Sequence, residues 1–185
     1  IRDNLYWFFS RTSKKTRRKW EQEAMNLIDH LYNVPCIGLW VLFNEGWGQF
    51  STNEMVALAR EADPTRLIDA ASGWYDQGSG DMNSFHNYFF PLVIPRDPRK
   101  NERVAVLSEY GGYSYGIPEH TTTEAIYGYG TYKDTESLKA AYEKRRQEAM
   151  RLIPQGLCAS VYTQVSDIED EVNGIYTYDR KVKKI

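Results

Sequence analysis

The sequence predicts an α/β fold with parallel strands, because two apolar segments each end in a glutamate and glycines. The first segment, Cys36–Phe43, is apolar or glycine throughout, which is typical of a strand buried on both faces of a sheet. The second, Arg103–Gly112, repeats the same order of apolar strand, carboxylate and glycines. In parallel α/β folds, ligands bind at the carboxyl ends of the strands. Glu45 and Glu109 are therefore the first candidate functional residues.

The first half of the chain alternates between predicted helices and strands. Apolar side chains recur at helical spacing from about Thr16 to Leu31, which predicts a helix that ends before Pro35. The Cys36–Phe43 strand follows. A capping box at Ser51–Glu54 predicts the start of a second helix, and Asp63-Pro64 predicts its end.

The rest of the chain adds strands, a third helix and three loops. Pro154 and Gly156 stop the last helix, and the long loop Tyr110–Lys133 is expected to cover the site. The other two loops are residues 1–14, with the aromatic patch Tyr6–Phe9, and the proline-rich Phe90–Arg99. The remaining predicted elements are strands at Arg66–Ala71, Met82–Asn87 and 103–112, a helix at about Thr135–Leu152 and a strand at Leu157–Thr163.

Composition excludes some classes of function and leaves others open. With 42% hydrophobic residues and a net charge of −2, the chain can bury a core as one domain, 1–185, and has no long-range attraction for nucleic acid or a membrane surface. No apolar run approaches the about 18 residues of a membrane span. Cys36 and Cys158 fall in different predicted strands and are interpreted as small buried hydrophobes, which leaves the cellular compartment open.

Two buried strands of one sheet that each end in a glutamate can direct both carboxylates into one pocket, and paired carboxylates are typical of glycoside hydrolysis. One carboxyl group protonates the leaving oxygen, and the other attacks the anomeric carbon or activates water. A partly dry strand end suits Glu45 to donate a proton near neutral pH. The alternative is that Glu45 is a solvated loop residue after a core strand. The aromatic content of 14%, with 14 Tyr and 5 Trp, suits stacking on sugars, although most of these rings are expected to fill the core.

Three segments resemble glycoside hydrolase family 2, the family of β-galactosidases, β-glucuronidases and β-mannosidases. Asn44–Trp47 resembles its acid/base motif, Ser108–Gly112 resembles its nucleophile motif, and Val161–Lys181 resembles the end of its catalytic domain. The resemblance implies a (β/α)8 TIM barrel, which needs about 250 residues. The five predicted strands match strands four to eight. The chain is therefore expected to be a partial catalytic barrel, with the upstream strands and accessory β-domains belonging to a longer parent chain.

The resemblance also implies roles for individual residues. Glu45 matches the acid/base and Glu109 the nucleophile, while Asn44 matches the residue that binds the sugar 2-hydroxyl. Tyr88 matches the hydrogen-bond donor to the nucleophile, and His86 is as well explained by a structural role. Trp47 and Trp74 are candidate platforms on which a sugar could stack, although core packing explains Trp47 equally well. Tyr162 stands where many family members have Trp, and Gln164 is a candidate hydrogen-bond partner of a sugar hydroxyl.

The predicted function is that of a retaining exo-β-glycosidase that acts on carbohydrate and requires no organic cofactor. No residues mark a metal site, and whether a metal ion assists stays open. Glu171–Asn173 lacks the lysine that pairs with a uronic carboxylate in the family's glucuronidases, so a β-galactosidase-like activity is favoured. A homo-oligomer is possible. The alternative is a catalytically incomplete barrel fragment that serves as a glycan-binding or structural module.

Two other sequence patterns carry little weight. Gly112–Gly116 fits the G-x-S-x-G pattern of serine hydrolases, but Pro118 argues against the helix that must follow Ser114. His30, His86 and His120 lack the spacing of a metal-binding motif.

Overall fold

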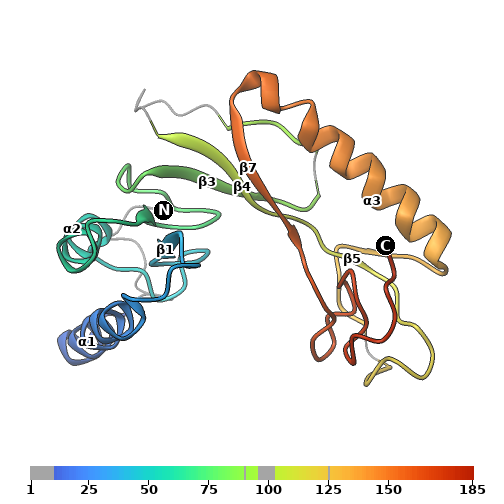
Figure 1. The fold of residues 1–185 in the computed structure, drawn as a ribbon, viewed down its shortest axis with the longest axis horizontal. Coiled ribbons are helices and arrows are strands. Elements are labelled where there is room, and N and C mark those ends of the chain that lie inside the picture. The colour runs from blue at the N-terminus through green and yellow to red at the C-terminus, as the bar shows by residue number, and fades with distance from the viewer. Residues whose placement is uncertain (1–10, 90, 96–102, 125) are drawn as a thin grey trace. The chain divides into compact units, whose positions relative to one another are not determined.

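The computed structural model describes residues 11–89, 91–95, 103–124 and 126–185, which separate into two compact units (Figure 1). The first unit comprises residues 1–85 and 95–106, and the second comprises residues 86–94 and 107–185. Tyr6–Phe9 and half of the proline-rich loop lie outside the described residues. The division passes through two strands, so the single-domain expectation stays a prediction. Each unit is described by itself below.

The first unit is a strand–helix–strand arrangement preceded by a helix. Its elements are α1 (Lys14–Leu31), β1 (Leu39–Val41), α2 (Thr52–Ala62) and β2 (Leu67–Asp69). β1 and β2 pair in parallel, with Trp40 opposite Ile68. α1 and α2 lie side by side (Figure 1). The buried side chains that join the helices to the strand pair are Ile28, Trp40, Val56, Ala59, Ile68 and Ala70.

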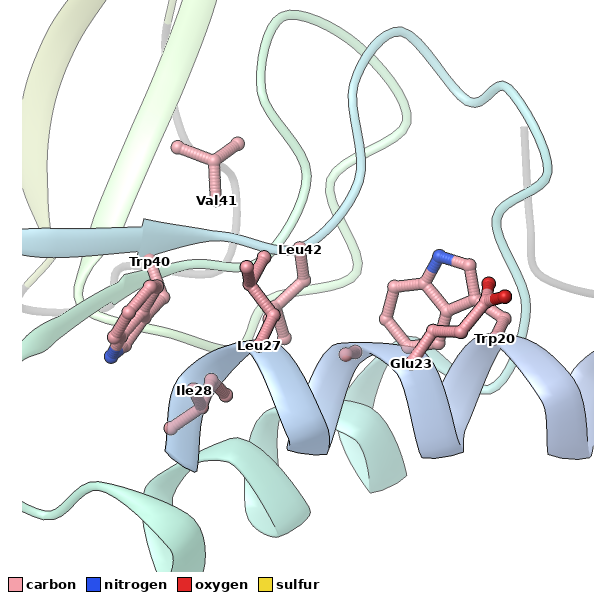
Figure 2. Close-up of a pocket in the computed structure, with 8 residues that line it drawn as sticks. Trp20, Glu23, Leu27, Ile28, Trp40, Val41 and Leu42 are labelled. Atoms are coloured by element: carbon pink, nitrogen blue, oxygen red, sulfur yellow. The ribbon is translucent and has the colours of Figure 1, made fainter. Parts of the chain in front are cut away.

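The prediction that Cys36–Phe43 is a strand buried on both faces is wrong in extent and in burial. β1 has three residues, of which Trp40 is buried while Leu39 and Val41 are exposed. The physical reason is the alternation of side chains along a strand: Trp40 faces α1, and its neighbours face the side that neither helix covers. Figure 2 shows the groove between α1 and β1, in which Leu27 approaches Leu42.

Two local predictions in this unit also need correction. Ser51 precedes α2 as predicted, but its φ of 39° is left-handed and its side chain caps no backbone N–H, so the capping box does not form. Cys36 is exposed because it lies in the turn before β1. Cys158 is exposed because it lies in a stretch of β7, Cys158–Val161, in which every side chain is exposed, so neither cysteine is the predicted buried hydrophobe.

A buried polar network fixes the end of α2 against β1. Asp63 is fully buried and accepts hydrogen bonds from Trp40 Nε1 at 2.9 Å, Thr65 Oγ1 at 2.6 Å and Arg66 Nη1 at 2.6 Å. Burial alone would raise the pKa of Asp63, but the bonds from Thr65, Arg66 and Trp40 outweigh it and hold that pKa well below its usual range. Asp63 is therefore an ionised anchor whose contribution to stability is present near neutral pH and is lost in acid.

The second unit contains the ends of two strands, a parallel strand pair, a helix and the last strand. β3 (Met82–Asn87), β4 (Val104–Gly111) and β7 (Leu157–Thr163) are neighbours in this order in one sheet. β5 (Tyr113–Ser114) and β6 (Gly130–Thr131) pair in parallel inside the segment predicted to be a loop throughout, which corrects that prediction. α3 (Thr135–Met150) ends two residues before the predicted boundary, and a 3₁₀ turn (Ile153–Gln155) follows.

The described residues thus form a mixed α/β fold with three α-helices and parallel strands. All five predicted strands are present, with β3 and β7 at their predicted bounds. No described residue between β2 and β4 is helical. Closure into a barrel stays a prediction from the sequence. None of the helices in the described ranges is long and apolar enough to cross a membrane.

We expect Ile68→Ala to lower the free energy of unfolding of the first unit by about 2–5 kcal/mol, since it leaves a cavity beside Trp40. Leu67→Ala, at a residue that is 49% exposed, should cost less than about 1 kcal/mol. Urea unfolding followed by tryptophan fluorescence measures both values, because all 5 Trp precede residue 85. Equal losses in the two variants would contradict this assignment of the core.

Candidate active site

Glu45 follows directly on the β1–β2 strand pair. An isolated parallel bridge joins Asn44 to Ser72, and the Glu45 N–H donates to Ser72 O at 2.9 Å. The backbone then turns sharply, with left-handed φ values of 54° at Glu45 and 79° at Gly46. A non-glycine residue held in this region stores strain, and such residues are concentrated at functional sites. The half-buried Glu45 side chain is therefore set by its backbone at the end of a strand.

A second loop, which follows β2, locks the turn that carries Glu45. The ring of Tyr75, itself at a left-handed φ of 64°, fills the space over Gly46, so a Cβ at Gly46 would overlap it. Gln49 is fully buried, and its Nε2 donates to Tyr75 O at 3.0 Å and to Thr52 Oγ1 at 2.9 Å. The sequence analysis did not single out Gln49, whose only local signal is its place after Gly-Trp-Gly.

The two predicted tryptophan platforms are exposed in the first unit. Trp47 is 62% exposed and Trp74 is 46% exposed, which excludes core packing as the explanation of Trp47 within the described residues. Asn44 is also exposed. Contact of these three exposed side chains with sugar stays a prediction.

Glu109 lies near the carboxyl end of β4, between groups from β3 and β7. The Tyr88 hydroxyl, just after β3, donates a hydrogen bond to Glu109 Oε2. It also lies 3.3 Å from Thr163 Oγ1 at the end of β7. His86 Nδ1 lies 3.6 Å from the same Glu109 oxygen, with its side chain fully buried. The structure therefore brings together three of the predicted residues, Glu109, Tyr88 and His86.

The state of Tyr88 suits it to orient a carboxylate. Burial and the hydrogen bond with Glu109 both raise the pKa of the Tyr88 hydroxyl, so it stays protonated and donates. Tyr88 and His86 thus approach the same carboxylate oxygen of Glu109, Oε2.

Tyr129, from the segment between β5 and β6, covers Tyr88. The two rings stack with centroids 3.7 Å apart and an interplanar angle of 11°. The Tyr129 N–H donates to Gly112 O at 3.0 Å, and Gly112 has a left-handed φ of 64° at a position where a Cβ would overlap the Tyr129 ring. The sequence analysis missed both Tyr129 and Thr163.

Tyr162 and Gln164, on either side of Thr163, lie in different surroundings. Tyr162 packs edge-on against Tyr110 and Tyr142, with centroids 5.5 and 4.9 Å away, and Tyr142 belongs to α3. Burial raises the pKa of its hydroxyl. Gln164 Nε2 instead donates to Asn173 Oδ1 at 2.7 Å. A role in binding sugar stays a prediction for both residues.

The serine of the G-x-S-x-G match is structural. Ser114 is fully buried, and its hydroxyl donates to Tyr127 O at 2.8 Å. His120 pairs instead with Asp179, Nδ1 to Oδ2 at 2.9 Å. These contacts support the rejection of a serine nucleophile.

Comparison with known proteins identifies the fold. No family model matches the sequence, and no curated protein matches it. Among solved structures, the chain is similar to a β-D-glucuronidase from Dictyoglomus thermophilum, with TM-score 0.66 and 16% identity over 94% of this chain and 34% of that one. An FMN-binding β-glucuronidase from Facaelibacterium prausnitzii L2-6 gives TM-score 0.63 and 20% identity over 93% and 31%. A candidate β-galactosidase from Bacteroides fragilis gives TM-score 0.61 and 16% identity, over 90% of this chain and 29% of that one.

These matches show that the chain has the fold of part of a β-glycosidase. It spans about a third of the length of the glycosidases it matches. At such identities the likeness concerns the fold, and the chemistry has to be argued from the residues.

We expect Gly46→Ala to lower the free energy of unfolding of the first unit by about 1–3 kcal/mol, because alanine is strained at φ 79° and its Cβ displaces Tyr75. Gly38→Ala is the matched control, since a Cβ at Gly38 meets nothing within 4 Å. It should leave stability unchanged or raise it by up to about 1 kcal/mol. Urea unfolding by tryptophan fluorescence measures both, and a harmless Gly46→Ala would rule out a locked turn at Glu45.

Proposed function

We propose that this chain carries the two catalytic carboxyl groups of a retaining exo-β-glycosidase, Glu109 as nucleophile and Glu45 as acid/base. The observation that carries the proposal is the Glu109 carboxylate, held through one oxygen by a protonated tyrosine. A nucleophilic carboxylate must stay ionised and aimed at the substrate, and a hydrogen bond to its charged form serves both needs. The β-glycosidase-like fold agrees with this chemistry.

In the first step, Glu45 donates its proton to the glycosidic oxygen. The bond between that oxygen and the anomeric carbon breaks, the aglycone leaves as an alcohol, and a carboxylate oxygen of Glu109 bonds to the anomeric carbon. Tyr88 keeps its hydrogen bond to Oε2, which spreads and orients the charge of the attacking carboxylate. Asn44 holds the sugar 2-hydroxyl, and Trp47 and Trp74 stack on the sugar rings.

In the second step, Glu45 removes a proton from water, whose oxygen bonds to the anomeric carbon from the side that the aglycone left. The ester bond to Glu109 breaks and its carboxylate is restored. Two displacements retain the configuration of the sugar. Glu45 can serve as base because esterified Glu109 no longer carries a neighbouring negative charge.

The favoured substrate is a β-galactoside-like neutral sugar. Glu171–Asn173 supplies a carboxylate and an amide, and no cation, at the segment that the resemblance places beside the sugar. The alternative, an incomplete glycan-binding or structural module, draws support from the length of the chain, about a third of that of the matched glycosidases. Hydrolysis of a β-glycoside would support the enzyme, and binding without hydrolysis would support the module.

The two carboxylates should have different mutant phenotypes when the chain is studied within the longest polypeptide that its gene encodes. Glu109→Gln should lower kcat on every substrate by a factor of about 10⁴ or more, because no nucleophile remains. Glu45→Ala should keep most of its glycosylation rate on aryl glycosides with good leaving groups, and azide should restore its deglycosylation. Nitrophenyl and dinitrophenyl β-glycosides with a burst-phase assay measure these rates.

Glu61→Gln, at an exposed position on α2, is the control and should match the wild type. Equal losses on both leaving groups with no rescue by azide would remove the role given to Glu45. No turnover by the wild type on a panel of β-glycosides would favour the binding module.

A retaining mechanism also makes a geometric prediction. The carboxyl groups of Glu45 and Glu109 should lie about 5–5.5 Å apart, because the nucleophile needs no room for an intervening water. A crystal structure of the same polypeptide with a covalent glycosyl intermediate trapped on Glu109 measures the distance and identifies the nucleophile. A separation beyond about 6.5 Å would indicate an inverting enzyme.

A further inference from the structure

The connection from β2 to β3, residues 70–81, contains no helix, so individual hydrogen bonds have to hold its shape. Its start is tied to the segment after β1, because Ser72 N donates to Phe43 O at 2.8 Å. Its end is tied to β2, because Ile68 N donates to Asp81 Oδ2 at 2.7 Å. The middle of this β2–β3 loop lies between the two anchors.

Arg103, the residue before β4, holds the middle of the loop. Its Nη1 and Nη2 donate to Asp76 Oδ1 and Oδ2 at 2.7 and 2.8 Å, the two-point geometry that arginine forms with a carboxylate. Nη1 also donates to Ser79 O at 3.0 Å and to Met82 O at 2.9 Å. The side chains of Arg103 and Asp76 are only 7% and 17% exposed. One largely buried guanidinium therefore binds the loop and the first residue of β3 together.

The residue next to this ion pair is the one that contacts the Glu45 turn. Tyr75 precedes Asp76, has a left-handed φ of 64°, and fills the space over Gly46, where a Cβ would overlap its ring. On the other side of Asp76, Gln77 Nε2 donates to Tyr75 O at 2.7 Å. A backbone in this strained region persists only when its surroundings hold it there. The Arg103–Asp76 pair fixes the chain directly beside that strained residue.

Burial distinguishes this pair from a second ion pair on the same loop. A largely buried guanidinium that lost its carboxylate would be left without a counter-charge, which is costly. Arg60 Nη2 donates to Asp81 Oδ2 at 2.8 Å, but these two side chains are 44% and 30% exposed. Exposed pairs contribute little to stability. Arg103 and Asp76 are therefore the pair able to determine how the loop lies.

We propose that Arg103 and Asp76 are positioning residues for the turn that carries Glu45. The pair fixes the middle of the β2–β3 loop, the loop holds the Tyr75 ring over Gly46, and the ring keeps the turn in place. The link to acid/base catalysis rests on the proposed function, whereas the restraint on the turn rests on these contacts alone.

The first test asks whether the pair affects the proton transfer assigned to Glu45, in the longest polypeptide that the gene encodes. Arg103→Lys keeps the positive charge but loses the planar fork. It should lower kcat/KM at least about tenfold on phenyl β-galactoside, whose leaving group needs a proton, and less than about threefold on dinitrophenyl β-galactoside, whose leaving group needs none. Asp76→Asn, which removes the charge of the other partner, should show the same difference.

Arg60→Lys is the matched control, since it changes the exposed ion pair on the same loop. It should change both values of kcat/KM by less than about twofold. Thermal unfolding shows whether each variant is folded, and Asp76→Asn decides in the same way if Arg103→Lys does not fold. Equal losses on both leaving groups in a folded variant, or no loss on either, would overturn the inference and leave the proposed function intact.

A double-mutant cycle in the 185-residue chain tests the restraint on the turn without turnover. Gly46→Ala displaces the Tyr75 ring, and the loop yields more easily once Arg103 is lysine. The factor by which Gly46→Ala raises the unfolding equilibrium constant should therefore be at least about threefold smaller in the Arg103→Lys background. Gly38→Ala should be additive with Arg103→Lys, because a Cβ at Gly38 meets nothing within 4 Å.

Urea unfolding followed by tryptophan fluorescence measures the four constants of each cycle. Additive effects of Gly46→Ala and Arg103→Lys would overturn the inference. Coupled effects in a protein that hydrolyses no β-glycoside would support the restraint on the turn and count against the proposed function alone.

Discussion

The hydrogen bond from Tyr88 to Glu109 is the interaction around which the second unit is arranged, and each neighbouring element restrains one side of it. Tyr129 stacks on the face of Tyr88, and Gly112 makes room for Tyr129. The buried Arg145 of α3 donates to Asn87 O at 3.3 Å and so ties the helix to the residue before Tyr88. An oriented donor gains its effect from being fixed before the substrate arrives, because no reorganisation is then needed during the reaction.

In the first unit, the β1–β2 strand pair ends in a turn that carries the Glu45 side chain. The turn needs left-handed backbone at Glu45 and Gly46, and the cost of that conformation is offset by the fully buried Gln49, which holds Tyr75 over it. The turn that carries Glu45 thus depends on backbone geometry, and Glu109 is contacted by the side chains of Tyr88 and His86. Different surroundings for two carboxyl groups are what separate an acid from a nucleophile in glycoside hydrolysis.

Local sequence signals predicted the elements that local forces determine. β3 and β7 have their predicted bounds, and Asp63-Pro64 ends α2 as expected, because proline and strand alternation act over a few residues. β1 is shorter and more exposed than its apolar run suggested, since burial depends on which elements cover each face. Thr163 and Tyr129 escaped prediction because their roles arise from contacts with Tyr88, which is 75 residues from Thr163 in the chain. The sequence therefore predicted the site residues that lie in recognisable motifs, and it missed those that join the site through contacts distant in the chain.

The aromatic content, which first suggested a sugar site, has two separate physical roles in the structure. Tyr162 contacts both Tyr110 and Tyr142, and Tyr113 packs on Tyr132, so these buried and half-buried rings pack against one another in the second unit. Burial raises the pKa of four of these five hydroxyl groups: Tyr110, Tyr113, Tyr132 and Tyr162. Tyr88 belongs to the same buried population, yet its hydroxyl contacts a carboxylate. Composition therefore could not distinguish Tyr88 from the other tyrosines, because they share the same aromatic chemistry and differ in what the hydroxyl contacts.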